Sequence, residues 1–213
     1  MGSAAPRSSR FRLTALVAIL SALVLAAPAG AVLISQDLSA PGDGLITFDT
    51  DTNLQWLDVT ATLNLSYDDL IAGAGGFIAA GFGFATNTQV ETLWTNAGVV
   101  DTSGLLLITN RAGVDLLLSL MGCTSSCGTG NDVQQGQAEF DPAQVELNGP
   151  FLQLAGGNLA RADIDPGFTQ ARDFTSPTLG NFLVRVVPEP STSLLVGSGL
   201  LILGASRRRS HRS

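Results

Sequence analysis

The chain ends in a short apolar segment followed by arginines, and this feature limits how much of the chain can form a globular domain. Residues 194–205 are apolar apart from glycines and one serine, and arginines follow at positions 207, 208, 209 and 212. Such a helix is held in a bilayer with its cationic end on the cytoplasmic side, because moving guanidinium groups across is costly. The 16 residues from 191 to 206 make about 24 Å of helix against a hydrocarbon core of roughly 30 Å. Residues 188–213 therefore predict a short C-terminal transmembrane helix, separate from the folded body.

A Pro-Glu-Pro tripeptide stands directly before this segment. The residues of the pattern are Pro188, Glu189, Pro190, Arg207, Arg208 and Arg209. Pro-Glu-Pro, an apolar helix and an arginine cluster, in that order, resemble the PEP-CTERM sorting signal of Gram-negative bacteria. The resemblance implies recognition by a membrane-embedded exosortase, cleavage near the tripeptide, and release or attachment at the cell surface, often in exopolysaccharide producers. A permanent inner-membrane anchor is the alternative, but the marginal length of the span favours transient retention.

The other end of the chain predicts export as well. Arg7, Arg10 and Arg12 precede an apolar stretch at 13–27, and Ala29-Gly30-Ala31 fits the small-x-small cleavage pattern. Together they predict a secretory signal peptide at residues 1–31, which implies the Sec translocon as a partner. A transmembrane helix is the alternative, but the apolar run is short and ends at a proline. We expect the mature chain to begin near Val32.

Residues 32–187 remain as one acidic extracytoplasmic domain, long enough to bury a core. This body holds 17 of the 18 acidic residues and four of the 11 arginines, a net charge of about −13. Such a surface repels nucleic acid and anionic lipid, so we expect no nucleic-acid partner. It attracts divalent cations or basic partners, or it simply keeps an exported protein soluble.

Two missing residue types exclude several kinds of chemistry. The chain has no lysine, so its glycine-rich stretches cannot form a Walker-type phosphate site. The only histidine, His211, lies beyond the apolar tail, so a serine or cysteine nucleophile in the body has no histidine base. A zinc site there would lack imidazole ligands. We therefore predict a non-enzymatic protein and assign no catalytic residue.

The two cysteines, Cys123 and Cys127, are separated by three residues. In an oxidising compartment an even count favours one small disulfide loop. A redox-active pair is the alternative, although such pairs usually have two intervening residues and a basic or helix-terminal environment.

Alternation of apolar and polar residues around a polar turn predicts a β-hairpin at residues 46–56. Within it, Asp49, Asp51 and Asn53 occupy the first, third and fifth places of a calcium-loop pattern. Leu54 and Thr60 then replace the glycine and glutamate that the pattern requires. An Asx-rich turn is the favoured interpretation and a calcium site the weaker alternative; no other cofactor is expected.

Helix signals predict three short helices in the middle of the body. Ser66 caps one over 67–71, Thr86 and Gln89 have capping-box spacing for a second that stops at Gly98, and a third begins near Asn110 and ends at Gly122. Apolar patterns predict strands at 151–154 and at 182–187, with Phe182, Val184 and Val186 on one face. Helices between β segments at both ends predict an α+β domain with a small, mainly antiparallel sheet.

Three separate segments of the body together form a second pattern. They are Gly42-Asp43-Gly44 with Ile46, Thr47, Asp49, Thr52, Leu54 and Trp56; Phe82-Gly83-Phe84-Ala85-Thr86 with Gln89, Val90 and Leu93; and Leu183-Val184-Arg185-Val186-Val187. Together they resemble the Lcl C-terminal type of C-type-lectin-like domain, in which a hairpin leads into helices and a final strand closes the domain. The resemblance implies a lectin-like scaffold across the body.

Two functional hypotheses follow. The first is a non-enzymatic surface or extracellular-matrix protein that binds glycan or has a structural role in exopolysaccharide. The second is a carboxylate-dependent polysaccharide hydrolase. Asp163 and Asp165 are its best local candidates, because alternate residues of an extended strand point to the same side.

Overall fold

The structure is a computed structural model that describes residues 31–141, 146–164 and 169–187. The predicted transmembrane tail, its Pro-Glu-Pro, its arginines and nearly all of the predicted signal peptide, Ala29 included, lie outside these ranges. Within them, no helix combines the length and the apolar character that a bilayer crossing requires.

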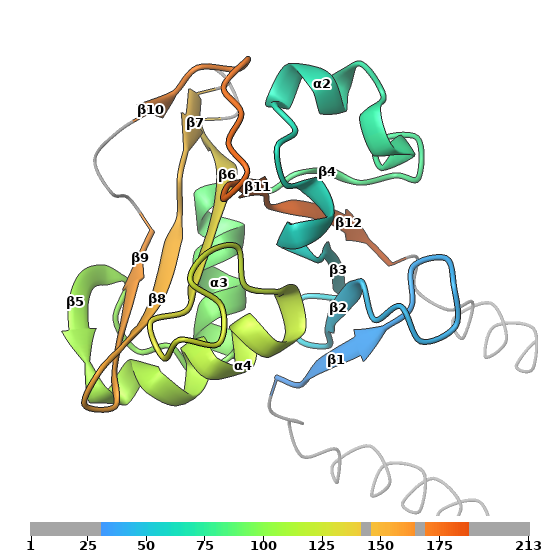
Figure 1. The fold of residues 1–213 in the computed structure, drawn as a ribbon. Coiled ribbons are helices and arrows are strands. Elements are labelled where there is room, and N and C mark those ends of the chain that lie inside the picture. Colours follow the sequence, from blue (N-terminus) through green and yellow to red (C-terminus); the bar gives the residue numbers. More distant parts are fainter. Residues whose placement is uncertain (1–30, 142–145, 165–168, 188–213) are drawn as a thin grey trace, which may run out of the picture.

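The body is an α+β fold with two sheets and short helices (Figure 1). The first sheet is antiparallel, in the order β1 (Leu33–Gln36), β2 (Ile46–Asp49), β3 (Leu54–Leu57), β12 (Leu183–Val186) and β4 (Gly83–Phe84). The second has the order β10 (Thr169–Gln170), β7 (Glu146–Asn148), β6 (Val133–Asp141), β8 (Phe151–Ala155), β9 (Leu159–Asp163) and β5 (Ser103–Leu107). The short strand β11 (Gly180–Asn181) pairs in parallel with β6.

The three predicted helices are present: α2 (Tyr67–Ile71), α3 (Asn87–Asn96) and α4 (Arg111–Met121). Short 3₁₀ turns η1 (Val59–Thr62), η2 (Ala74–Gly76) and η3 (Ile108–Asn110) connect the elements. Both predicted N-caps form full capping boxes, Ser66 with Asp69 and Thr86 with Gln89. Hydrogen bonds from Ser66 lower the pKa of the Asp69 carboxyl.

The main core lies between the two sheets and the helices α3 and α4. Trp56 and Val184 from the first sheet, and Phe182 between β11 and β12, meet Leu152, Ala160 and others from the second. The helix α3 packs on β6, and α4 packs on β8 and β9. Trp94 of α3 packs edge-on against Phe182, with ring centroids 6.3 Å apart. A second cluster on the other face of the first sheet joins Ile46, Leu57, Leu70, Phe82 and Leu183.

The last strand differs from its prediction. Phe182 and Val184 are buried on one face as expected, but Val186 is 70% exposed and Leu183 is fully buried on the opposite face. The reason is position: β12 lies between β3 and β4, so both of its faces meet apolar clusters, but β4 pairs only with Leu183 and Val184, and Val186 has a strand partner on one side alone, at Leu54.

The paired strands β6 and β11 each place a glycine in a close contact that has no room for a Cβ. A Cβ on Gly180 would clash with the Val59 carbonyl, and a Cβ on Gly136 would lie 2.8 Å from the Phe182 ring. These contacts join the closing segment of the chain to the second sheet.

We expect Gly180→Ala to lower the free energy of unfolding by about 1–3 kcal/mol, because the backbone must shift to admit the methyl group. Urea unfolding of the purified protein measures it. The matched control is Gly156→Ala in the exposed β8–β9 turn, where nothing lies within 4 Å of the added carbon. Equal stability of the two variants would contradict the close contact.

Candidate functional site

One face of the second sheet carries polar, charged and aromatic side chains instead of core residues. Along β8 and β9, Leu152, Leu154, Ala160 and Ala162 point into the core. The alternate residues point to the other face and are half-buried, apart from Asp163, which is mostly buried. Directly paired residues of antiparallel strands share a face. The registers therefore define two rows of side chains across β6, β8, β9 and β5. The first row is Gln135, Phe151, Asp163 and Ser103. The second row is Val133, Gln153, Arg161 and Leu106. We call these eight residues the β8–β9 face.

The centre of this face is an aromatic ring, a guanidinium and a carboxylate. The Arg161 guanidinium carbon lies 5.4 Å from the centroid of the Phe151 ring. Nη2 of Arg161 donates to Oδ2 of Asp163 at 2.6 Å. Nε of the same arginine is buried and has no hydrogen-bond partner in the described structure.

The neighbouring strand β5 is shaped to admit this pair. Its pairing with β9 shifts register between Ser103 and Leu106, which is the sign of a β-bulge. Gly104 lies in this bulge with a φ of +84°, and a Cβ there would lie 2.7 Å from Oδ2 of Asp163. Glycine is required at this position both for its backbone conformation and for the space that the carboxylate occupies.

At the other end of β6, aromatic and amide side chains are closely packed. The Tyr67 ring stacks on Phe84 at 4.3 Å and lies under the Arg172 guanidinium at 4.5 Å. Burial raises the pKa of Glu139, and burial followed by the charge of Glu139 raises the pKa of Tyr67. Gln137, which shares the face of Glu139, is fully buried and donates to Gln170 at 3.0 Å. This end therefore offers a ligand little surface, in contrast to the half-exposed Phe151 and Arg161.

The structure describes only one of the two acids proposed for a hydrolase. Asp163 is mostly buried and bound by Arg161, and Asp165 lies outside the described residues. The sequence placed Asp163 on an extended strand, which β9 confirms. Its arginine and phenylalanine partners were not predicted, because they depend on the register between β8 and β9.

The predicted hairpin is confirmed, and its turn uses the calcium-pattern residues structurally. Asp49 is fully buried and accepts hydrogen bonds from the Asp51 N–H, the Thr52 hydroxyl and Asn96 Nδ2. The side-chain amide of Asn53 donates to the Val187 carbonyl. The described part of the chain contains no group of three or more acidic, cysteine or histidine side chains placed to hold a metal ion. A calcium site in this turn stays a prediction.

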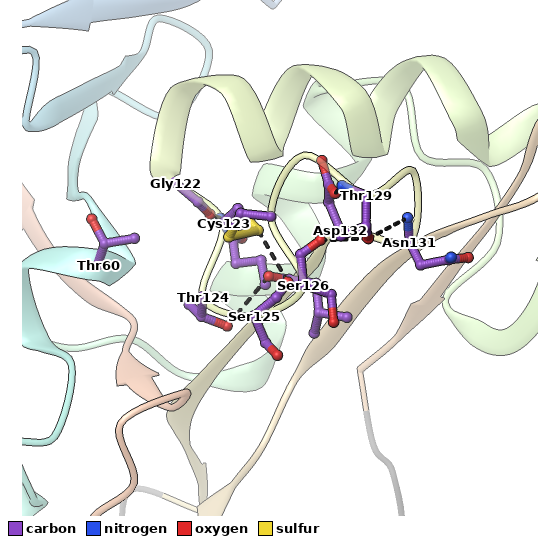
Figure 2. Close-up of a disulfide and its surroundings, with 12 residues drawn as sticks. Thr60, Gly122, Cys123, Thr124, Ser125, Ser126, Thr129, Asn131 and Asp132 are labelled. Carbon is purple, nitrogen blue, oxygen red and sulfur yellow. Dashed lines mark hydrogen bonds between the residues drawn. A yellow bond between two sulfur atoms is a disulfide. The ribbon is translucent and has the colours of Figure 1, made fainter.

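Cys123 and Cys127 form a disulfide directly after α4, with their Cα atoms 5.8 Å apart (Figure 2). The loop they close is also tied to the start of β6. Val133 accepts from the N–H of Thr124 at 2.7 Å, and the Gln135 N–H donates to the Thr124 hydroxyl at 3.1 Å. The disulfide loop thus borders the β8–β9 face at its Val133 and Gln135 edge.

Comparison with known families adds one finding at the C-terminus. Residues 186–209 match the PEP-CTERM protein-sorting motif. The chain therefore carries a motif of exosortase substrates, which implies export toward the cell surface and processing by an exosortase. No curated protein and no solved structure matches the chain, so the lectin-like resemblance of the body has no support from a relative.

We expect the double variant Cys123→Ser and Cys127→Ser to remain folded and to lose about 2 kcal/mol of unfolding free energy or less. A disulfide that spans a sequence separation of four restricts the unfolded chain only slightly, and the backbone hydrogen bonds to β6 remain. Urea unfolding of the native and double-variant proteins measures the loss. A variant that fails to fold would show that the loop depends on the disulfide alone.

Proposed function

We propose that this chain is an exported, exosortase-sorted surface or matrix protein whose body binds polysaccharide through the β8–β9 face without catalysing a reaction. The sorting motif at 186–209 supports the location. The Phe151, Arg161 and Asp163 arrangement supports the binding and is the observation on which this part of the proposal depends.

The chemistry of the face suits a sugar ring. A pyranose presents C–H groups on its faces and hydroxyls around its rim, so it needs an apolar plate bordered by donors and acceptors. Phe151 supplies the plate, because an aromatic ring buries apolar area in a defined orientation. Gln135 and Gln153 supply amides that both donate and accept, and Ser103 supplies a hydroxyl.

The charge of the body and of the β8–β9 face limits which polysaccharides can bind there. Arg161 is neutralised by Asp163, while the body as a whole carries about −13. A polyanionic polysaccharide would be repelled at low ionic strength. The proposed ligand is therefore a neutral polysaccharide, or an anionic one bridged by divalent cations.

The element order supports a lectin-like scaffold as part of the proposal. An N-terminal hairpin leads into helices, and the last strand returns to pair with that hairpin, as the resemblance implies.

The hydrolase alternative has one specific observation in its favour. Burial raises the pKa of Glu139, as a general acid requires. Its surroundings are packed by Tyr67 and Gln137, and a glycosidase needs a second carboxylate across the scissile bond. The binding proposal is therefore the better supported of the two.

Sorting is tested at Glu189. We expect Glu189→Gln to leave an uncleaved, membrane-retained protein, seen as a mobility shift and by membrane fractionation. Glu91→Gln, the same change on the exposed side of α3, serves as the matched control and should process normally. Identical processing of the Glu189 variant and the unsubstituted protein would remove the exosortase proposal.

Binding is tested at Phe151. We expect Phe151→Ala to weaken retention on the producing cell's own polysaccharide about tenfold, which corresponds to about 1.4 kcal/mol. Affinity electrophoresis of the purified mature protein, with and without calcium, measures it. Phe174→Ala is the control, because Phe174 is an exposed phenylalanine outside the β8–β9 face. Equal retention of both variants, or no retention of the unsubstituted protein, would contradict glycan binding by this face.

A further inference from the structure

The turn between β2 and β3 holds both ends of the folded body. At the N-terminal end, the Val32 N–H donates to the Thr50 hydroxyl at 3.0 Å, and the Val32 carbonyl accepts from the Thr50 N–H at 3.2 Å. At the C-terminal end, the Val187 N–H donates to the Asn53 carbonyl at 3.1 Å, and the Val187 carbonyl accepts from Asn53 Nδ2 at 2.8 Å. The four-residue turn at 50–53 therefore provides hydrogen-bond partners for the backbone N–H and C=O groups of both Val32 and Val187.

This turn is fixed to the core rather than projecting freely. Its first anchor is the buried Asp49 carboxylate, which accepts from the turn and also from Asn96 Nδ2 at the end of α3, at 2.9 Å. Asn53 itself has a φ of +57°, a left-handed conformation that asparagine and glycine tolerate best. A chain end bound to this turn is therefore held by the rigid part of the domain.

Val187 is the last described residue of the body. The next residue is Pro188, which has no N–H to donate and so cannot extend the pairing. A following proline also favours an extended backbone at Val187. The described body thus ends at the Asn53-bound Val187, directly before the Pro-Glu-Pro, and its last two residues already belong to the matched motif at 186–209.

We propose that Asn53 is a positioning residue for C-terminal processing: by holding Val187 it keeps β12 in the sheet, so that the bonds within 183–187 are closed to the processing enzyme and the cut falls beyond Val187. The inference deepens the proposed function and rests on it. Cleavage breaks one peptide C–N bond; the tail leaves with the new amine, and the acyl carbon of the body passes to water or to an acceptor amine. Asn53 touches neither reacting group and decides only which bonds are within reach.

The physical reason is that a protease-type site takes up an extended segment whose backbone groups are free. Residues of β12 are engaged by β3 and β4 and are not free while Val187 is held. The side chain of Arg185 reinforces this, because it donates to Gln55 at 2.8 Å and to the Ala80 carbonyl at 3.0 Å. Loosening Val187 frees the terminal contact of this strand, so β12 frays from that end and bonds before the Pro-Glu-Pro become open to cleavage.

The test is Asn53→Gly in the full-length chain, expressed in the exporting cell. Glycine keeps the left-handed backbone and the Asn53 carbonyl, and it removes only the amide that binds Val187. The matched control is Asn158→Gly, the same change at a φ of +64° in the β8–β9 turn. We expect amide exchange of the C-terminal peptide in the purified protein to rise about fivefold in the Asn53 variant and to stay unchanged in the control.

Intact mass of the processed protein then gives its C-terminus. We expect one defined end for the native and Asn158 proteins, and additional ends within 183–187 for Asn53→Gly. Unchanged exchange would show that Asn53 does not hold Val187, and faster exchange with an unchanged end would show that holding it does not position the cut; either result overturns the inference. If the unsubstituted chain keeps its whole tail, the exosortase proposal fails first and this inference fails with it.

Discussion

The fold depends on the pairing of β12 with β3, which joins segments about 130 residues apart in the chain. Trp56 faces Val184 across this pair, and both belong to the core that α3 and α4 cover. Because β12 also separates the two apolar clusters, neither cluster is complete until the last residues of the body are in place. Such non-local contacts pay their loop-closure entropy before they gain packing energy. The domain therefore forms as one unit, and its two ends are brought to the same sheet.

Each of the four arginines of the body contacts an aromatic ring or a carboxylate of the same domain, and these contacts affect the charge of its surface. Arg161, Arg172 and Arg185 each lie over an aromatic ring, and Arg111 pairs with Asp115 one helical turn away. Their charges serve local packing and ion pairs instead of forming a basic patch. The surface that remains is acidic, and the β8–β9 face is close to neutral because its one arginine meets its one carboxylate. A neutral face on an acidic body favours ligands that carry little charge of their own.

Local signals in the sequence predicted the hairpin and all three helices, because caps, turn residues and apolar periodicity are properties of neighbouring residues. The long strand β6 was missed: its Val-Gln-Gln-Gly-Gln start has no apolar alternation, since one side of it carries amides and the other holds Gly136 against Phe182. The sequence did not predict that both faces of β12 are buried, because a central strand lacks the polar face that would mark its exposed side. For the candidate site, composition pointed to the acids alone. Phe151 and Arg161 become neighbours of Asp163 only through strand register, which no single segment encodes.

The proposed attachment and the proposed binding use different sheets of this fold. Both ends of the folded body are held by the β2–β3 turn of the first sheet, whereas the β8–β9 face belongs to the second, with β5, β8 and β9 on the opposite side of the molecule from β1 and the end of β12 (Figure 1). The face is also fixed at both margins, by the Gly104 bulge on β5 and by the disulfide loop beside Val133. A face held in this way loses little conformational entropy when a ligand binds. The proposed attachment through an end of the folded body and the proposed binding therefore involve separate surfaces, of which the second is preorganised.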